Sequence, residues 1–195
     1  MILMHDIIRE GDERLRQKSK DVETPVSEED INLLKDMLEY VHNSVDDEIG
    51  PKYGLRPSVG LAAPQLGILK KIIAISAYDE SGRLHDYALI NPKILSYSDE
   101  LTYLPSGEGC LSVDREVKGL VHRRKRITFK APVFENNKLT EKTIKLKDYI
   151  AVVFQHEYDH LQGYLFVDRI NKKILSMFQK IQLKLILEMK KKMTS

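Results

Sequence analysis

The chain has 195 residues, of which 42% are hydrophobic and 31% charged, and its formal net charge is +2 at pH 7. This length allows one ordinary domain, and the near-neutral charge excludes a surface devoted entirely to nucleic acid. The single cysteine, Cys110, excludes an intramolecular disulfide and indicates a reducing, cytoplasmic setting. Charged residues crowd the first twenty positions and the chain lacks a long apolar run, so neither a signal peptide nor a membrane span is expected.

In chain order, the first predicted element is an amphipathic helix beginning after Ser27. Three acidic residues follow Ser27, and apolar side chains then recur at helical spacing, at Ile31, Leu34, Leu38, Val41 and Val45. Residues 46–58 contain Gly50, Pro51, Gly54 and Pro57, which interrupt any periodic pattern. This composition predicts a surface loop.

Between residues 60 and 147, short β-rich runs alternate with turn residues. We expect antiparallel strands over residues 72–75 and 87–90. A later hairpin is expected to pair residues 127–131 with residues 139–146, separated by Pro132 and the Asn136-Asn137 pair.

Residues 149–161 contain no Gly or Pro and begin with a nearly continuous apolar run, which predicts a buried helix with Asp148 as its cap and Gly163 as its stop. Residues 171–195 combine apolar residues at helical spacing with many lysines and predict a basic amphipathic tail. We therefore expect an α+β fold, with antiparallel sheets around the central buried helix, an N-terminal amphipathic helix and a C-terminal helix. The expected organisation is a catalytic domain over residues 1–170 and a tail over residues 171–195.

The predicted buried helix carries His156, Glu157 and His160. Because four residues turn through about 400°, the two imidazoles lie on one face and can hold one metal ion together. Glu157 lies about 100° around the helix, suitably placed as a general base toward a metal-bound water but poorly placed as a ligand. The alternative, two hydrogen-bonded surface histidines, is disfavoured because the preceding residues are apolar and predict burial.

Two imidazoles leave a catalytic metal site one ligand short, because such sites usually have three protein ligands. A third histidine six positions after His160 is excluded, since Phe166 stands there. The remaining soft donor is Cys110, in a segment where Gly107 and Gly109 allow a turn and close approach of the backbone. The alternative is that Cys110 is a small buried hydrophobic residue.

The segment from Val59 to Gln65 is small and apolar apart from one amide. Its glycine, Gly60, and two alanines allow another backbone or a substrate to come close. Gln65 can then donate its side-chain N–H to a developing oxyanion. The alternative is a tightly packed core turn without a chemical role.

Together, three segments resemble the motifs of the peptide deformylase family, in its Gram-positive-type branch. Residues 58–65 resemble Gly-x-Gly-x-Ala-Ala-x-Gln, residues 108–112 match Glu-Gly-Cys-x-Ser, and residues 155–160 match the family's histidine-bearing helix. The one departure is Ser58, which stands where the first motif begins with glycine. The resemblance implies removal of the formyl group from the initiator methionine of nascent polypeptides, with release of formate.

The resemblance also implies the role of each site residue. The residues that match the metal ligands are Cys110, His156 and His160. Glu157 matches the general acid/base, and Gln65 with the backbone N–H of Leu111 matches the oxyanion hole. The implied cofactor is one Fe(II) ion per chain, replaceable by Ni(II), Co(II) or Zn(II), whereas thiolate and imidazole ligands alone suit both Zn(II) and Fe(II).

The substrate is expected to lie against small and apolar residues around this centre. The helix face that bears the histidines continues as an apolar wall that can receive a methionine side chain. The predicted substrate-binding residues are Val59, Gly60, Gly109, Tyr149, Val152 and Val153. Behind the ligands, Asp159 faces away from the ion, and we expect it to pair with Arg123.

The predicted partners are N-formylmethionyl nascent peptides and, through the tail with Lys190, Lys191 and Lys192, the ribosome. No membrane and no specific DNA partner are expected. Two other functions remain open from the residues alone. A zinc peptidase with a His-Glu-x-x-His helix predicts a His, Asp or Glu as third ligand. A non-catalytic, metal-dependent binding domain predicts that Glu157 is dispensable.

Overall fold

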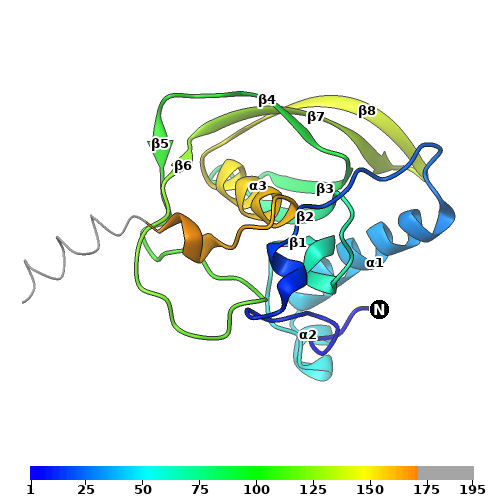
Figure 1. Ribbon diagram of the computed structural model, residues 1–195, viewed down its shortest axis with the longest axis horizontal. Coiled ribbons are helices and arrows are strands. Elements are labelled where there is room, and N and C mark those ends of the chain that lie inside the picture. Colours follow the sequence, from blue (N-terminus) through cyan, green and yellow to red (C-terminus); the bar gives the residue numbers. More distant parts are fainter. Residues whose placement is uncertain (171–195) are drawn as a thin grey trace, which may run out of the picture.

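The computed structural model describes residues 1–170, and within them the chain is α+β (Figure 1). The helices are α1 (Glu28–Ser44), α2 (Ile49–Tyr53) and α3 (Asp148–Leu161), with short 3₁₀ helices η1 (Glu13–Arg16), η2 (Ala63–Leu66) and η3 (Phe166–Arg169). The strands are β1 (Gly60–Ala62), β2 (Ile72–Tyr78), β3 (Leu84–Ile90), β4 (Lys93–Tyr97), β5 (Leu101–Thr102), β6 (Arg123–Arg124), β7 (Arg126–Glu135) and β8 (Lys138–Lys147). The α+β prediction is confirmed, and the helix predicted over 171–195 lies outside the described residues.

An antiparallel sheet wraps around helix α3. Its strands follow the order β1-β2-β3-β7-β4, and β8 pairs with β7. Strands β3 and β7 meet at the pair Leu89 and Val133. Strands β1, β2 and β3 lie on one side of α3, whereas β4, β7 and β8 arch over its other side (Figure 1). The predicted arrangement of antiparallel strands around a central buried helix is therefore confirmed.

Strand β2 is buried on both faces, which explains its continuous apolar sequence. Side chains alternate along a strand, so Ile72 and Ala74 face α1 while Ile73 and Ile75 face α3. The α1 side of the core contains Leu34, Met37, Tyr40, Val41, Ala88 and Ile90. The α3 side contains Leu89, Phe129, Leu146, Ile150, Val153 and Phe154. This double burial fixes the position of β2, and therefore that of β1, which pairs with it.

The first predicted helix is confirmed as α1, which Ser27 caps by accepting the Asp30 backbone N–H at 3.1 Å. The prediction of a loop throughout residues 46–58 was wrong, because α2 lies within it. The Asp46 carboxylate accepts the N–H groups that begin this helix, including that of Ile49 at 2.8 Å. Pro51 lies in the first turn, where a missing N–H costs nothing, and Gly54 ends the helix with φ of 62°.

The predicted hairpin is confirmed as β7 and β8, but both strands are longer than expected. The prediction that Pro132 interrupts the first strand was wrong, because Pro132 pairs with Glu141 within β7. It lies between Lys130, the last residue paired with β4, and Val133, which meets β3. A missing N–H is tolerated at such a gap in the ladder.

The predicted buried helix is confirmed as α3, but its cap was predicted wrongly. Asp148 is the first helical residue, has φ of 51°, and gives no side-chain capping bond. Its backbone N–H instead donates to the Lys125 carbonyl at 2.8 Å. Gly163 follows the helix with φ of 80°, as its predicted role as a stop requires.

Candidate metal centre and substrate cavity

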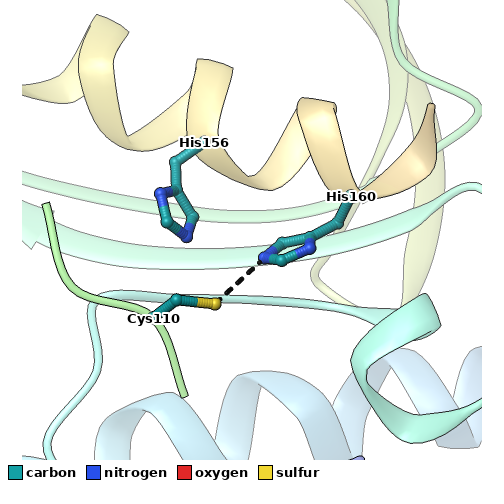
Figure 2. Close-up of side chains that lie close together, drawn as sticks. All are labelled: Cys110, His156 and His160. Atoms are coloured by element: carbon teal, nitrogen blue, oxygen red, sulfur yellow. Dashed lines mark hydrogen bonds between the residues drawn. The ribbon is translucent and has the colours of Figure 1, made fainter. Parts of the chain in front are cut away.

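Helix α3 presents two histidines to the loop that carries Cys110 (Figure 2). His156 and His160 are buried one helical turn apart, with ring centroids 5.2 Å from each other. The Cys110 Sγ lies 3.4 Å from His160 Nε2. One ligand atom from each of the three residues lies within 4.8 Å of the other two. The fold therefore gathers one thiol and two imidazoles at one point.

Cys110 is held in place by a tight turn and by an arginine. The Val113 N–H donates to the Cys110 carbonyl at 3.2 Å and closes the turn. Arg56 donates to the same carbonyl at 3.2 Å and pairs with Asp114 at 2.6 Å. These contacts fasten the loop to the segment before β1, with the thiol directed toward α3.

This donor set fits a divalent transition metal. In a tetrahedral site with the usual metal–ligand distances, a sulfur and a nitrogen ligand lie roughly 3.6 Å apart, close to the 3.4 Å between Cys110 Sγ and His160 Nε2. Burial lowers the pKa of His160 well below its usual range, so its imidazole is neutral, the form that binds metals. His156 donates from Nδ1 to Glu108 at 2.8 Å, which leaves its Nε2 as the ligand atom.

Glu108 is a site residue that the sequence analysis did not assign. Its carboxylate accepts hydrogen bonds from His156 and, at 2.8 and 2.9 Å, from the Arg123 guanidinium. Burial raises the pKa of such a carboxyl, but the bonds from Arg123 and His156 outweigh burial and hold the pKa of Glu108 at about 2. The carboxylate is therefore charged and fixes the ring of His156, a candidate metal ligand.

The same arginine reaches the far side of α3. Arg123 Nη1 lies 2.5 Å from an Asp159 carboxylate oxygen, and Arg169 donates to the same carboxylate at 2.8 Å. Asp159 thus meets Arg123, as the sequence analysis expected, in a network that also contains Glu108. The only signal for Glu108 was an acidic residue two positions before the cysteine, because its partners are distant in sequence.

Glu157 lies beside the candidate ligands and against β1. Its side chain is buried, and Oε2 finds no hydrogen-bond partner within residues 1–170. Burial raises the pKa of Glu157 to about 7. A Cβ placed on Gly60 would lie 2.5 Å from Glu157 Oε1. The glycine in β1 therefore makes the space that the carboxylate occupies.

Gln65 is buried in η2 with its amide aimed at the cluster. Its Oε1 accepts the Ala62 backbone N–H at 2.9 Å, which fixes the orientation of the amide. Its Nε2 then lies 3.6 Å from Cys110 Sγ and 3.5 Å from Ser112 Oγ. The segment is a tightly packed turn, and it also presents an N–H donor to the cluster. Tight packing of this turn is therefore compatible with a chemical role for Gln65.

A cavity of about 340 Å³ opens onto this cluster. Most of the site residues expected from the sequence line it, namely Val59, Gly60, Gln65, Gly109, Cys110, Leu111, Tyr149, Val152, Val153, His156 and Glu157. Ser58 and Glu108 also line the cavity. His160, Asp159 and Arg123 are buried but lie outside this lining.

A curved antiparallel sheet around a helix that offers two imidazoles and a carboxylate, with a thiol opposite, defines a metal-dependent hydrolase. The chain belongs to the polypeptide deformylase family, whose model matches residues 4–174. Members of this family are hydrolases that remove the formyl group from N-formylmethionine peptides. The resemblance inferred from the three motifs is therefore confirmed.

Similar proteins include both curated relatives and solved structures. Peptide deformylase 2 of Bacillus anthracis is 56% identical over 172 residues, 88% of this chain and 92% of the relative. A peptide deformylase structure from Ehrlichia chaffeensis has a TM-score of 0.71 and 28% identity, covering 97% of this chain and 99% of that one. An Acinetobacter baumannii deformylase structure with Met-Ala-Ser bound has a TM-score of 0.65 and 27% identity, covering 84% of this chain and 96% of that one.

These findings decide between the functions left open by the residues. The peptidase alternative required a His, Asp or Glu as third ligand, whereas Cys110 lies with the two histidines. Family membership supports neither a peptidase nor a non-catalytic binding domain.

No helix in the described part of the chain is long and apolar enough to cross a membrane.

Proposed function

We propose that the 340 Å³ cavity binds the formylmethionyl end of a peptide, and that Cys110, His156 and His160 hold one Fe(II) ion there. The observation that supports this proposal most directly is the convergence of the three ligand atoms within 4.8 Å of one another, beside a cavity that Cys110, His156 and Glu157 line. When bound, the ion would supply Lewis acidity, which lowers the pKa of water so that hydroxide, the nucleophile, forms near neutral pH. Ni(II), Co(II) or Zn(II) would replace Fe(II) at the same ligands.

Glu157 is the general acid and base of the proposed reaction. Its carboxylate accepts a proton from the attacking water and later gives a proton to the leaving amine. Burial raises the pKa of Glu157 to about 7, and such a pKa suits a group that must both accept and donate protons near neutral pH. The absence of a Cβ at Gly60 leaves room for the carboxylate at the cavity wall.

Gln65 and Leu111 stabilise the charge that develops on the formyl oxygen. The Gln65 amide is oriented in advance by its bond to Ala62, so its Nε2 donates without reorganisation. The Leu111 backbone N–H supplies a second donor, on the loop that Arg56 fastens in place. Two oriented donors in a largely buried site stabilise an oxyanion better than water does.

The peptide itself binds along the edge of the sheet. The residues that receive the methionine side chain are Val59, Tyr149, Val152 and Val153. Strand β1 is the first strand of the sheet, with β2 on one side and the cavity on the other. An extended peptide can add to such an edge through backbone hydrogen bonds, with Gly60 on one side and Gly109 on the other.

Three further assignments rest on the sequence. We propose that residues 1–170 form the catalytic domain and residues 171–195 a basic tail, that the enzyme acts in the cytoplasm, and that the tail contacts the ribosome through Lys190, Lys191 and Lys192. Neither a membrane nor a specific DNA site is a proposed partner. Deleting residues 172–195 should abolish co-sedimentation with ribosomes, and salt should weaken it in the full chain. Equal co-sedimentation of both proteins would remove the ribosome from the proposal.

The proposed reaction is tested by measuring formate release from formyl-Met-Ala-Ser. Protein purified without oxygen and loaded with Fe(II) or Ni(II) should release formate, and the Glu157→Ala variant should bind the metal without releasing formate. Failure of the metal-loaded wild type to release formate would refute the substrate. Full activity of Glu157→Ala would refute the role of the carboxylate.

A further inference from the structure

Ser58 lies at the cavity wall with its hydroxyl on the backbone of Gly60. Its Oγ donates to the Gly60 carbonyl at 2.6 Å and lies 3.4 Å from the Gly60 N–H. The residues with positive φ do not include Ser58, so serine is unstrained here although the family motif begins with glycine. The side chain therefore contributes its contacts at no backbone cost.

The register of β1 shows which backbone groups of this strand face the cavity. The Ser76 N–H of the segment paired with β1 donates to the Val59 carbonyl at 3.0 Å, and Leu61 is opposite Ala74. Alternate residues of an antiparallel strand point their N–H and C=O to opposite sides. Because Val59 and Leu61 bond to β2, Gly60 directs both groups to the free edge, where an extended peptide would pair.

We propose that the Ser58 hydroxyl occupies this pairing position and competes with the substrate backbone for Gly60. A partner strand would donate one N–H to the Gly60 carbonyl and accept the Gly60 N–H. The hydroxyl oxygen lies near both groups and donates to the carbonyl in the same way. Ser58 thus weakens peptide binding until its side chain rotates away.

The surrounding contacts confine the change to that side chain. The Ser58 backbone N–H donates to Ser44 Oγ at 3.0 Å, and Ser44 Oγ donates to the Val41 carbonyl at 2.9 Å in α1. These bonds anchor the Ser58 backbone to a buried helix end. Rotation about the Cα–Cβ bond therefore frees Gly60 without moving the segment.

This proposal rests on the proposed function, and variants of Ser58 in the full-length, metal-loaded enzyme test it. Ser58→Ala should lower the KM for formyl-Met-Ala-Ser and the Kd for the product Met-Ala-Ser by roughly 2- to 10-fold, the range of one hydrogen bond, with kcat unchanged. Ser58→Thr keeps the hydroxyl and should restore wild-type values. Ser58→Gly should behave as Ser58→Ala, and a thermal unfolding curve reports whether each variant is folded.

A set of N-methylated substrates identifies the substrate N–H that competes with the Ser58 hydroxyl for Gly60. In formyl tripeptides that each carry one N-methylated backbone nitrogen, the gain from Ser58→Ala should disappear for the peptide that lacks the N–H paired with Gly60. An unchanged or raised KM in Ser58→Ala would overturn the competition, and so would a Ser58→Thr variant with the alanine phenotype. Absence of formate from the wild type would instead refute the proposed function.

Discussion

Replacing Glu108 by glutamine should weaken the metal centre and the fold together, because one buried carboxylate serves both. In the wild type it accepts the His156 Nδ1 proton and two hydrogen bonds from Arg123. The glutamine keeps the shape of the side chain but removes its charge and turns one acceptor into a donor. That donor then faces either the imidazole N–H or the guanidinium, neither of which can accept it.

Two lines of reasoning give the size of the loss in stability. Breaking a buried ion pair by removing one partner typically costs about 3–5 kcal/mol. The pKa of Glu108 at about 2, against an ordinary value of 4.5, corresponds to about 3 kcal/mol of stabilisation of the charged carboxylate. We therefore expect the free energy of unfolding of the metal-free protein to fall by about 3 kcal/mol. Loss of the partner of a ligating histidine should lower metal affinity about 10- to 100-fold.

Urea unfolding and metal titration measure the two losses, and the molecule contains a matched control. Glu10 pairs with Arg115 through two hydrogen bonds at 2.8 and 3.0 Å, a geometry like that of Glu108 with Arg123 but at an exposed site. Glu10→Gln should cost less than about 1 kcal/mol and leave metal affinity unchanged. Equal losses in both variants, or no loss in Glu108→Gln, would show that burial does not make the Glu108–Arg123 pair more important for stability or for metal affinity than an exposed pair.

Four other perturbations test neighbouring parts of the site. Gly60→Ala should reduce kcat at least 100-fold while metal content stays at one ion per chain, because the new Cβ would lie 2.5 Å from Glu157 Oε1; a normal kcat would mean that the carboxylate has another place to lie. Gln65→Leu should lower kcat by about 10²-fold or more, with metal content unchanged, because it removes one oriented oxyanion donor; an effect on KM alone would argue against that role. Cys110→Ser should lose the metal at concentrations that saturate the wild type, as elemental analysis would show, and retained metal would exclude the thiolate as ligand. Chelation of the wild-type ion should lower the melting temperature, because a ligand at 100 times its Kd stabilises the fold by about 2.7 kcal/mol.

The features that the sequence predicted well are those determined by residues close together in the chain. The histidine pair and Glu157 share one helix, so their relative placement follows from helical geometry alone. Helix α1 likewise follows from its cap at Ser27 and the spacing of its apolar residues. No local pattern places residue 110 beside α3. Cys110 was assigned instead because the two histidines left one ligand missing and because the motifs resembled those of a known family.

The features that were missed depend on contacts between distant segments. The hydrogen bond between Glu108 and His156 joins residues 48 positions apart, and no spacing rule predicts it. Strand β7 continues through Pro132 because of where β3 and β4 meet it, which is a property of the sheet. Helix α2 is short and contains Gly50 and Pro51, so local propensity predicted a loop and only the carboxylate of Asp46 signalled its start.

The enclosure of α3 by the curved sheet also concerns how the protein opens. From Ile150 to Leu161 this helix is buried at every residue except Tyr158, with strands on both sides. We expect its backbone amides to meet solvent only when the whole domain unfolds, whereas the loop with Cys110 lies outside the helices and strands and should open once its few contacts with Arg56 break. Amide hydrogen exchange should therefore be slowest in the helix that carries two ligands and faster in the loop that carries the third. Metal release would then begin on the thiolate side, with the two imidazoles still in place for the next ion.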